Sequence, residues 1–405
     1  MRKWFTLLLL LGIAWPAMAA KTMSVEQMEQ LLVKLHGKPD GKVAGELEQV
    51  QLTERVSMAR LTRWETDFPG IHAHEALTRL ADAATFLNPP QADVVSDPPP
   101  EKETQQRMLE LAVDYVKTTM TRLPNFYATR ETTHFENVLV QEAIGSGISN
   151  GAGPGMRAIR SRETAVTMAD SKSLRSTGTY SAVVTYRDGQ EVREAVAGNG
   201  TKKDQPPVGL TTSGEFGPIL VVVIGDAARG RVSWLRWEQG ASEPVAVLGY
   251  SVPQGQSNFK VTMSEGEKID EVYPGYHGEI AIDPATGEIL RISAVADLPP
   301  PHERMQNALL VEYAPVTIGG RSYVCPVRGV AFSRKPVPGN PKEEPGANVS
   351  TLMRTQLNDV AFTHYHLFRA EVRIAGGGSG TSDATPTAPT GTAEPGSSQP
   401  PSQPQ

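Results

Sequence analysis

Two histidines in the last apolar stretch of the chain are the first candidates for binding chemistry. His364 and His366 stand one residue apart, and alternate residues of a strand share a face, so both would lie beside Phe362 and Phe368. Two imidazoles at this spacing could supply two ligands to a metal ion, but a zinc site needs more, and no Cys, Asp or Glu nearby in the sequence completes one. We therefore predict no metal and no other cofactor, and interpret the histidines as the polar lining of a core or of an apolar cavity.

A tryptophan extends this candidate site to a second strand. Trp234 and Trp237 lie three residues apart in a predicted strand, where they would point to opposite faces, so at most one of them can lie in a core. The other would be covered by a helix or by a ligand. The residues that we assign to ligand binding are Trp234, Phe362, His364, His366 and Phe368.

Three further features resemble catalytic groups but lack the surroundings that catalysis needs. Residues 147–151 match the Gly-x-Ser-x-Gly pattern of serine hydrolases, yet Ser149 is flanked by more glycines instead of the strand and helix that expose such a nucleophile. Cys325 has no neighbouring histidine or lysine motif that would favour its thiolate. Asp270 and Glu271 form a carboxylate pair in a polar, turn-like stretch, where a solvated surface is expected. We assign no catalytic residue.

The first residues have the layout of a secretory signal peptide. Arg2 and Lys3 precede an apolar run over 7–14, and the small-residue box over 17–19 predicts cleavage after Ala19. No later stretch approaches the roughly 20 apolar residues of a transmembrane helix. We expect an exported protein, in the periplasm or outside the cell, without a transmembrane segment.

Charge and cysteine content exclude several classes of protein. The 405 residues carry 39 Lys+Arg and 45 Asp+Glu, a formal net charge of −6, whereas a nucleic-acid-binding protein needs a basic field to displace phosphate counterions. The single cysteine cannot form an intramolecular disulfide in an oxidising compartment. We predict no nucleic-acid partner and a fold that is stabilised by burial of a core.

The elements that would position the candidate residues fall into an N-terminal helical region, 20–125, and a β region. Apolar residues recur at helical spacing over 24–35, 43–66, 73–87 and 101–122, with a possible break near Thr53. Ser24 and Gln27 have the spacing of a capping box, and Pro124 ends the longest helix.

The period changes to two after Asn125, which predicts a mainly antiparallel β domain over 126–375. Asp188-Gly189 is the strongest hairpin signal, and Phe216 to Ala227 favours one helix between the strands. Residues 376–405, rich in Gly, Pro, Ser and Thr, predict a disordered tail.

Two adjacent blocks carry a resemblance to a known fold. Residues 276–292 form a hairpin pattern around an Asp-x-x-Thr-Gly turn, and residues 311–327 form one around Ile-Gly-Gly. This order resembles the central sheet of the bacterial lipoprotein-carrier (LolA-like) fold, an open half-barrel wrapped over helices. The resemblance implies an α+β fold with a curved antiparallel half-barrel whose apolar concave side captures a lipid or an acylated chain. In sensor relatives it implies binding of an envelope partner.

These observations lead to one functional hypothesis and two alternatives. We expect an exported, non-enzymatic binding protein that carries a lipid or another apolar ligand in the cavity of a β half-barrel. The first alternative is an envelope scaffold or sensor that binds a protein partner. The second is a hydrolase with an unrecognised site.

Overall fold

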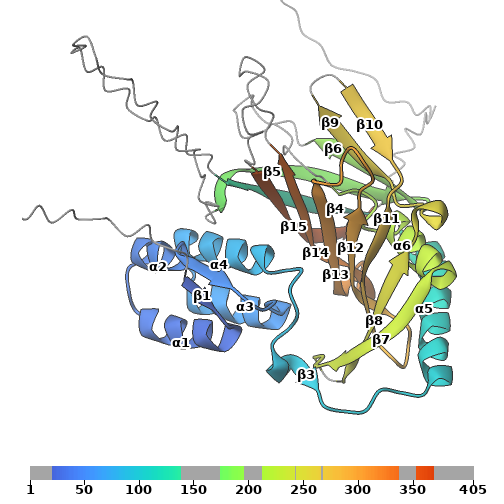
Figure 1. The fold of residues 1–405 in the computed structure, drawn as a ribbon, viewed down its shortest axis with the longest axis horizontal. Coiled ribbons are helices and arrows are strands. Elements are labelled where there is room, and N and C mark those ends of the chain that lie inside the picture. The colour runs from blue at the N-terminus through green and yellow to red at the C-terminus, as the bar shows by residue number, and fades with distance from the viewer. Residues whose placement is uncertain are drawn as a thin grey trace, which may run out of the picture. The chain divides into compact units, whose positions relative to one another are not determined.

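The computed structural model describes residues 21–137, 174–195, 212–241, 243–265, 268–336 and 353–368. These residues form six α-helices and a large antiparallel sheet of eleven strands, which confirms the α+β class (Figure 1). Among them, no helix has the length and apolarity needed to span a membrane. The sequence features at 1–19, 145–155 and 376–405 lie outside the described residues.

The first four helices form an N-terminal segment with its own core. They are α1 (Val25–Leu35), α2 (Asp40–Leu47), α3 (Met58–Asp67) and α4 (Ile71–Ala83), joined by the short parallel pair β1 (Lys21–Met23) and β2 (Val50–Leu52). Met28, Leu47 and Leu77 are fully buried at its centre. We call residues 21–87 the helical subdomain.

Local signals account for the helix boundaries of this subdomain. The capping box is confirmed: the Ser24 hydroxyl accepts a hydrogen bond from the Gln27 amide, and the Gln27 side chain accepts one from the Ser24 amide. The stretch 43–66 is divided between α2 and α3, with β2 between them, so the expected break lies near Thr53.

The main sheet is antiparallel throughout. Its strands, in spatial order, are β3 (Val94–Val95), β7 (Arg231–Glu238), β8 (Val245–Val252), β11 (Gly275–Ile282), β12 (Ile289–Asp297), β13 (Gln306–Ile318), β14 (Arg321–Pro336), β15 (Met353–Leu367), β4 (Phe126–Asn137), β5 (Leu174–Arg187) and β6 (Gln190–Ala195). The predicted Asp-Gly hairpin joins β5 to β6, with φ of 51° at Asp188 and 80° at Gly189. These positive angles are those of the tight turn that Asp-Gly favours.

A separate hairpin corrects one sequence interpretation. The polar stretch around Asp270 and Glu271 is not a turn but a strand, β10 (Lys268–Val272), which pairs with β9 (Val261–Glu265). Lys260 makes an exposed ion pair with Glu271, 3.2 Å long.

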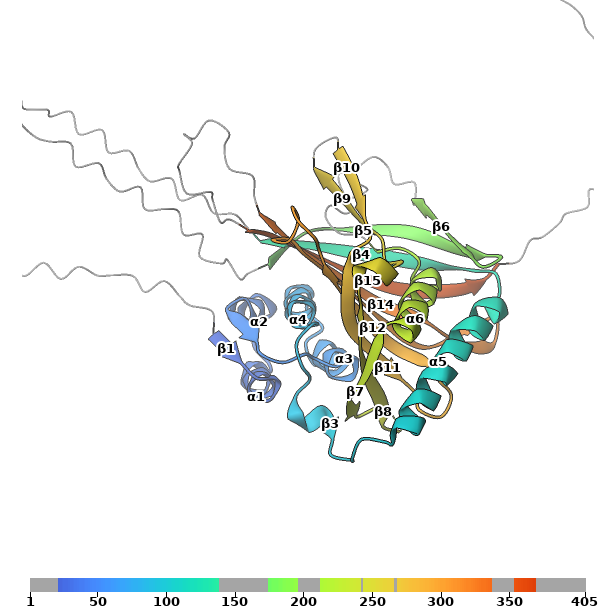
Figure 2. The same ribbon diagram turned by 45° about the vertical axis from the view of Figure 1, so that its right-hand side comes forward.

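The two faces of the sheet are covered by different helices (Figure 2). α5 (Lys102–Arg122) and the predicted α6 (Pro218–Arg229) lie on one face, which we call the helix face. The helical subdomain contacts the opposite face, where Phe86 packs on Phe332 with ring centroids 6.2 Å apart. We call this the subdomain face. Helix α5 therefore packs with the sheet and not with the first four helices, although it precedes β4 in the chain.

Candidate ligand-binding sites on the two sheet faces

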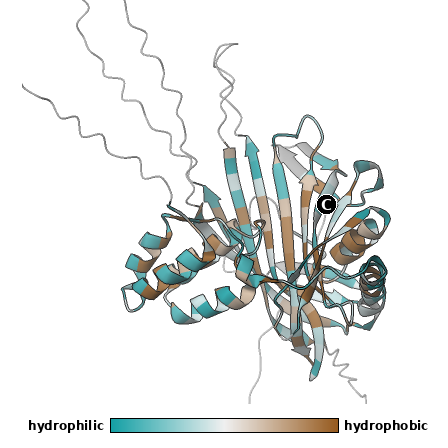
Figure 3. Ribbon diagram, turned by 60° about the horizontal axis from the view of Figure 1, so that its bottom comes forward, coloured by the Kyte–Doolittle hydropathy of each residue, from teal (hydrophilic) through white to brown (hydrophobic). Residues whose placement is uncertain are grey.

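The helix face is a continuous apolar surface across the middle strands. Figure 3 shows hydrophobic residues running along the strands in the middle of the sheet. Those that face α5 and α6 and are buried are Leu248, Tyr250, Val252, Tyr276, Ile280, Ile282, Ile289, Ile292, Ala294, Leu309, Val311 and Tyr313. Near-complete burial of such an area requires a cover, and the two helices supply it.

Helix α6 is fixed to this face by a buried carboxylate. Asp226 accepts hydrogen bonds from the Tyr276 hydroxyl at 3.0 Å and from the Asn258 amide and side chain at 2.7 and 2.6 Å. Arg229, one turn further along the helix, pairs with it at 2.6 Å. Because a buried carboxylate needs several donors, these contacts fix the position of α6 on the sheet.

Helix α5 is held by packing of a different kind. Ala112 and Val116 are buried against the α6 cluster, with Leu109 and Val113 partly buried beside them. The side-chain hydrogen bonds of Gln105 and Gln106 go to Pro100 and Glu110, within the helix or just before it. The buried contacts of Ala112 and Val116 with the sheet and with α6 are therefore apolar.

The turn between β11 and β12 contacts α5 directly. Gly287 has φ of 76°, and a Cβ on it would lie 2.4 Å from the backbone carbon of Leu111. Asp283 shapes the turn by accepting hydrogen bonds from the amides of Ala285 and Thr286, both at 2.9 Å. The Asp-x-x-Thr-Gly motif thus makes a glycine contact with the cover helix.

A cavity of about 610 Å³ lies between α5 and the sheet beside this turn. Its apolar lining residues are Leu111, Tyr115, Leu123, Pro315, Tyr323 and Val324, and its polar ones are Asp114, Thr118, Thr119, Arg122, Thr286, Glu288 and Ser322. Burial raises the pKa of Tyr115 to about 12, and burial also raises the pKa of Glu288 at the rim. In both cases the lost hydration disfavours the charged form of the group.

One predicted ligand residue, Phe362, lies inside a packed aromatic cluster. Its side chain is 4% exposed, and its ring meets that of Phe216 at 5.1 Å between centroids, edge to face. Phe126 stacks on Tyr186 at 5.3 Å and contacts Phe216 at the same distance. Aromatic side chains of the protein itself thus occupy this part of the helix face, where a ligand was expected.

The placement of the two histidines on the apolar face is wrong, because β15 contains a β-bulge. Thr363 pairs with Thr129 and His366 with Tyr127, so one extra residue lies in β15 between these pairs. His364 has a φ of 52° at the bulge, and both histidines are exposed. An extra residue reverses the alternation of faces. Tyr365 and Leu367 take the inward positions instead.

A second bulge corrects the placement of the tryptophans. Trp234 pairs with Leu248 and Arg236 with Val247, so Leu235 is the extra residue, and both tryptophans lie on one face. Their rings meet edge to face at 4.7 Å, and Trp234 packs partly buried against the helix-face core. Phe368 is 40% exposed, with the Arg187 guanidinium 6.0 Å from its ring centroid.

The five predicted residues thus do not form one site. Trp234 and Phe362 lie on the helix face, in different clusters, whereas His364, His366 and Phe368 are exposed at the end of β15. In the described part of the chain, no group of three or more His, Cys, Asp and Glu residues could hold a metal ion.

The subdomain face carries a network of three arginines and two glutamates, which the sequence analysis missed. Arg55 donates to both oxygens of Glu238 at 2.8 Å, and Arg291 pairs with Glu238 at 3.0 Å. Arg236 bonds Glu238 at 2.7 Å and both oxygens of Glu279 at 2.9 and 2.7 Å. We call these five residues the arginine–glutamate network.

The arginines control the ionisation of Glu238. Burial alone would raise the pKa of Glu238, but Arg291, Arg55 and Arg236 together outweigh it and lower this pKa to about 2. Glu238 is therefore ionised at every physiological pH. In β7 the aromatic Trp237 stands between the charged residues Arg236 and Glu238. This alternation was a local sign that one face of the strand is charged.

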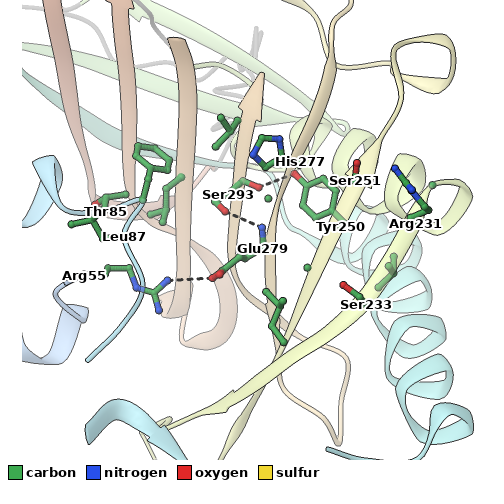
Figure 4. A pocket seen from close by; sticks show the side chains of 18 residues that line it. Arg55, Thr85, Leu87, Arg231, Ser233, Tyr250, Ser251, His277, Glu279 and Ser293 are labelled. Carbon is green, nitrogen blue, oxygen red and sulfur yellow. Dashed lines mark hydrogen bonds and ion pairs between the residues drawn. The ribbon is translucent and has the colours of Figure 1, made fainter. Parts of the chain in front are cut away.

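A groove of about 850 Å³ opens beside this network, between the subdomain and the sheet (Figure 4). Arg55 and Arg231 lie on opposite sides of it, with His277 and Glu279 between them. Strands β7, β8 and β12 contribute Ser233, Ser251 and Ser293, and the segment after α4 contributes Thr85, Phe86 and Leu87.

The sheet is distorted under the groove. The β11–β12 ladder lacks pairs between His277–Val295 and Ile280–Ile292. There the Glu279 amide donates to the Ser293 hydroxyl at 3.0 Å, and the Tyr250 hydroxyl donates to the Ser293 carbonyl at 2.7 Å. Side chains thus satisfy backbone groups that a regular ladder would pair.

Comparison with models of known protein families, with curated proteins and with solved structures finds no significant match to this chain.

Proposed function

We propose that this chain is an exported, non-enzymatic binding protein that holds a lipid or another apolar ligand between α5 and the helix face of its sheet. The observation that carries the proposal is the contrast between the two cover helices. α6 is tied down through Asp226, whereas the buried residues of α5 make apolar contacts and a cavity of about 610 Å³ lies along its edge. A helix held in this way can move outward and expose apolar surface to a ligand.

The sequence supports the rest of the proposal. The signal-peptide pattern over 1–19 supports export to the periplasm or beyond. The resemblance of 276–292 and 311–327 to lipoprotein carriers supports a half-barrel with an apolar ligand side, and α5 lies against the turn of the first of these blocks. The position of the cavity at the edge of α5 is an independent argument for the same side of the sheet.

Detergent-free purification of the exported mature protein tests this proposal. Native mass spectrometry should show an added mass of lipid size that solvent extraction removes, and the stripped protein should bind a fluorescent long-chain fatty acid. Val324→Asp places a charge in the cavity wall and should abolish this binding, because an apolar ligand packed against a carboxylate would remove part of its hydration.

Val192→Asp is the matched control, because Val192 is 50% exposed on edge strand β6. It should leave fatty-acid binding unchanged. Absence of both the co-purified mass and fatty-acid binding would refute the proposal, and so would equal binding by the Val324→Asp and wild-type proteins.

A further inference from the structure

The arginine–glutamate network has more positive than negative charge. Arg55, Arg236 and Arg291 contribute three cations, while Glu238 and Glu279 contribute two anions. The side chains of these five residues are between 9% and 24% exposed. Among these five residues the arginines thus outnumber the glutamates by one, in a largely desolvated position, and Glu312 lies opposite Arg291 in the β12–β13 ladder.

Burial and a neighbouring cation both act on Arg55. Burial, and after it the neighbouring charge of Arg291, lower the pKa of Arg55, although Glu238 and Glu279 act in the opposite direction. Arg55 is also the arginine of the network that lines the groove of Figure 4. An anion that entered the groove would meet the Arg55 guanidinium, which shares the carboxylate of Glu238 with Arg236 and Arg291.

The other lining residues favour an anion over a cation. Glu279 is the one carboxylate among them, and both of its oxygens are already bonded to Arg236. Across the groove, Arg231 is exposed and has no ion-pair partner among the described residues. Ser233 and Ser251 place hydroxyl groups between the two sides.

The groove also has an apolar wall. Phe86, Leu87 and Leu310 line it, and Leu87 and Leu235 remain 41% and 43% exposed. Leu235 lies over Gly249, where a Cβ would approach it to 3.1 Å. A ligand that matches both the arginine side and the apolar wall of the groove would combine an oxyanion with an apolar body.

We propose that this groove binds a small anionic ligand, a carboxylate or a phosphate monoester with an apolar body, whose oxyanion contacts Arg55 and whose body lies against Phe86 and Leu87. Arg231 attracts the ligand from the other side of the groove. This site lies on the opposite face of the sheet from the ligand proposed beneath α5 and does not depend on it.

Calorimetric titration with four aromatic probes of similar size tests the charge preference. Benzoate and phenyl phosphate should bind the mature protein at least about tenfold more tightly than benzyl alcohol, and benzylammonium should bind most weakly. High salt should weaken binding of the anions and leave that of benzyl alcohol unchanged. The tighter of the two anions identifies the ligand class as carboxylate or phosphate ester. Equal affinity for the anions and the alcohol would overturn the proposal.

Variants locate the site. Ser251→Trp fills the groove without touching the network and should abolish binding of both anions. Arg231→Gln should weaken anion binding several-fold and leave benzyl alcohol unaffected, and Arg304→Gln, at an exposed position away from the groove, should change neither. Val324→Asp should not affect anion binding, which separates this site from the one beneath α5. Unchanged anion binding in Ser251→Trp would refute the assignment to the groove.

The role of Arg55 is tested by a conservative pair. Arg55→Lys keeps the charge and should retain the preference for anions, whereas Arg55→Gln should remove it while the circular dichroism spectrum confirms folding. If Arg55→Gln does not fold, Ser251→Trp and Arg231→Gln still decide the question. A folded Arg55→Gln protein with an undiminished preference for anions would contradict contact with Arg55.

Discussion

Gly287 and Leu111 meet backbone to backbone, because the turn between β11 and β12 leaves no room for a side chain against α5. A Cβ on Gly287 would lie 2.4 Å from the Leu111 carbonyl carbon and 2.5 Å from its oxygen. Both atoms belong to the helix backbone and cannot move aside. The position of the cover helix on the sheet therefore depends on a glycine at 287.

Gly287→Ala should loosen α5. The left-handed φ of 76° alone costs a non-glycine residue about 1–2 kcal/mol, and the contact with Leu111 adds to this. Urea unfolding should show a loss of stability above that range, and hydrogen exchange should become faster along α5. Gly320→Ala is the matched control, since Gly320 has φ of 84° and nothing within 4 Å of its missing Cβ. Equal losses in the two variants would show that the contact with α5 contributes nothing.

Glu238→Gln should be strongly destabilising. It leaves Arg55, Arg236 and Arg291 with the single carboxylate of Glu279, and removing one partner of a buried ion pair costs about 3–5 kcal/mol. Glu271→Gln, which removes an exposed ion pair with Lys260, should cost about 1 kcal/mol or less. Chemical denaturation of both variants measures the difference. A loss of less than 1 kcal/mol for Glu238→Gln would show that the network is not coupled to folding.

A second ionic cluster should make stability depend on pH. Arg328 is buried and donates hydrogen bonds to Asp82 and, at 2.9 Å, to Glu312, and its Nε lies 3.5 Å from a carboxylate oxygen of Asp359. Burial, and after it the charge of Asp359, raise the pKa of Asp82 well above its usual range, and burial also raises the pKa of Asp359 despite Arg328. Glu65 of α3 also faces this cluster and raises the pKa of Asp359.

The sign of this pH effect follows from the raised pKa of the folded state. Below the ordinary carboxyl pKa of about 4, Asp82 is protonated in both the folded and the unfolded states, and its contribution to stability is complete. As pH rises, Asp82 loses its proton first in the unfolded state, because its pKa is lower there. Its contribution to the free energy of unfolding therefore falls until the pH passes the pKa of the folded state. Glu238 acts in the opposite sense: its pKa of about 2 in place of 4.5 adds stability that is lost as pH falls below 4.5.

Asp82→Asn should therefore flatten the decline in stability above pH 4. The free energy of unfolding, measured by urea titration across the pH range, should fall less steeply in this variant than in the wild-type protein. Asp188→Asn, at a side chain that is 76% exposed, should leave the profile unchanged. Parallel profiles for Asp82→Asn and the wild type would show that Asp82 does not carry the effect.

Cys325 should be unreactive in the folded protein. Its side chain is 1% exposed, and burial raises the pKa of its thiol to about 12, so almost no thiolate forms at neutral pH. An aromatic disulfide reagent should detect no thiol under native conditions and one thiol per chain in urea. Rapid labelling of the native protein would show that the Cys325 region opens readily.

Secondary structure was predictable where the signal is local. The capping box at Ser24, the Asp188-Gly189 turn and the helical spacing of 216–227 each depend on residues close in sequence, and all three are confirmed. β10 was missed because an exposed hairpin with polar residues lacks the apolar alternation that marks a half-buried strand.

The candidate site was less predictable because one extra residue in a strand reverses its faces. The bulges at His364 and at Leu235 exposed the histidines and brought Trp234 and Trp237 to one side. No glycine or proline lies at either bulge, so nothing in the local sequence marked them.

The sequence by itself determined the helices, most of the strands and the α+β class, because hydrophobic periodicity and turn residues act over a few positions. Tertiary structure alone decided which charges meet. Arg55 bonds Glu238 across 183 positions and Arg328 bonds Asp82 across 246. These pairs form because the helical subdomain docks on one face of a sheet whose strands come from distant parts of the chain. Such contacts depend on the register and bulges of every intervening strand, which no local pattern specifies.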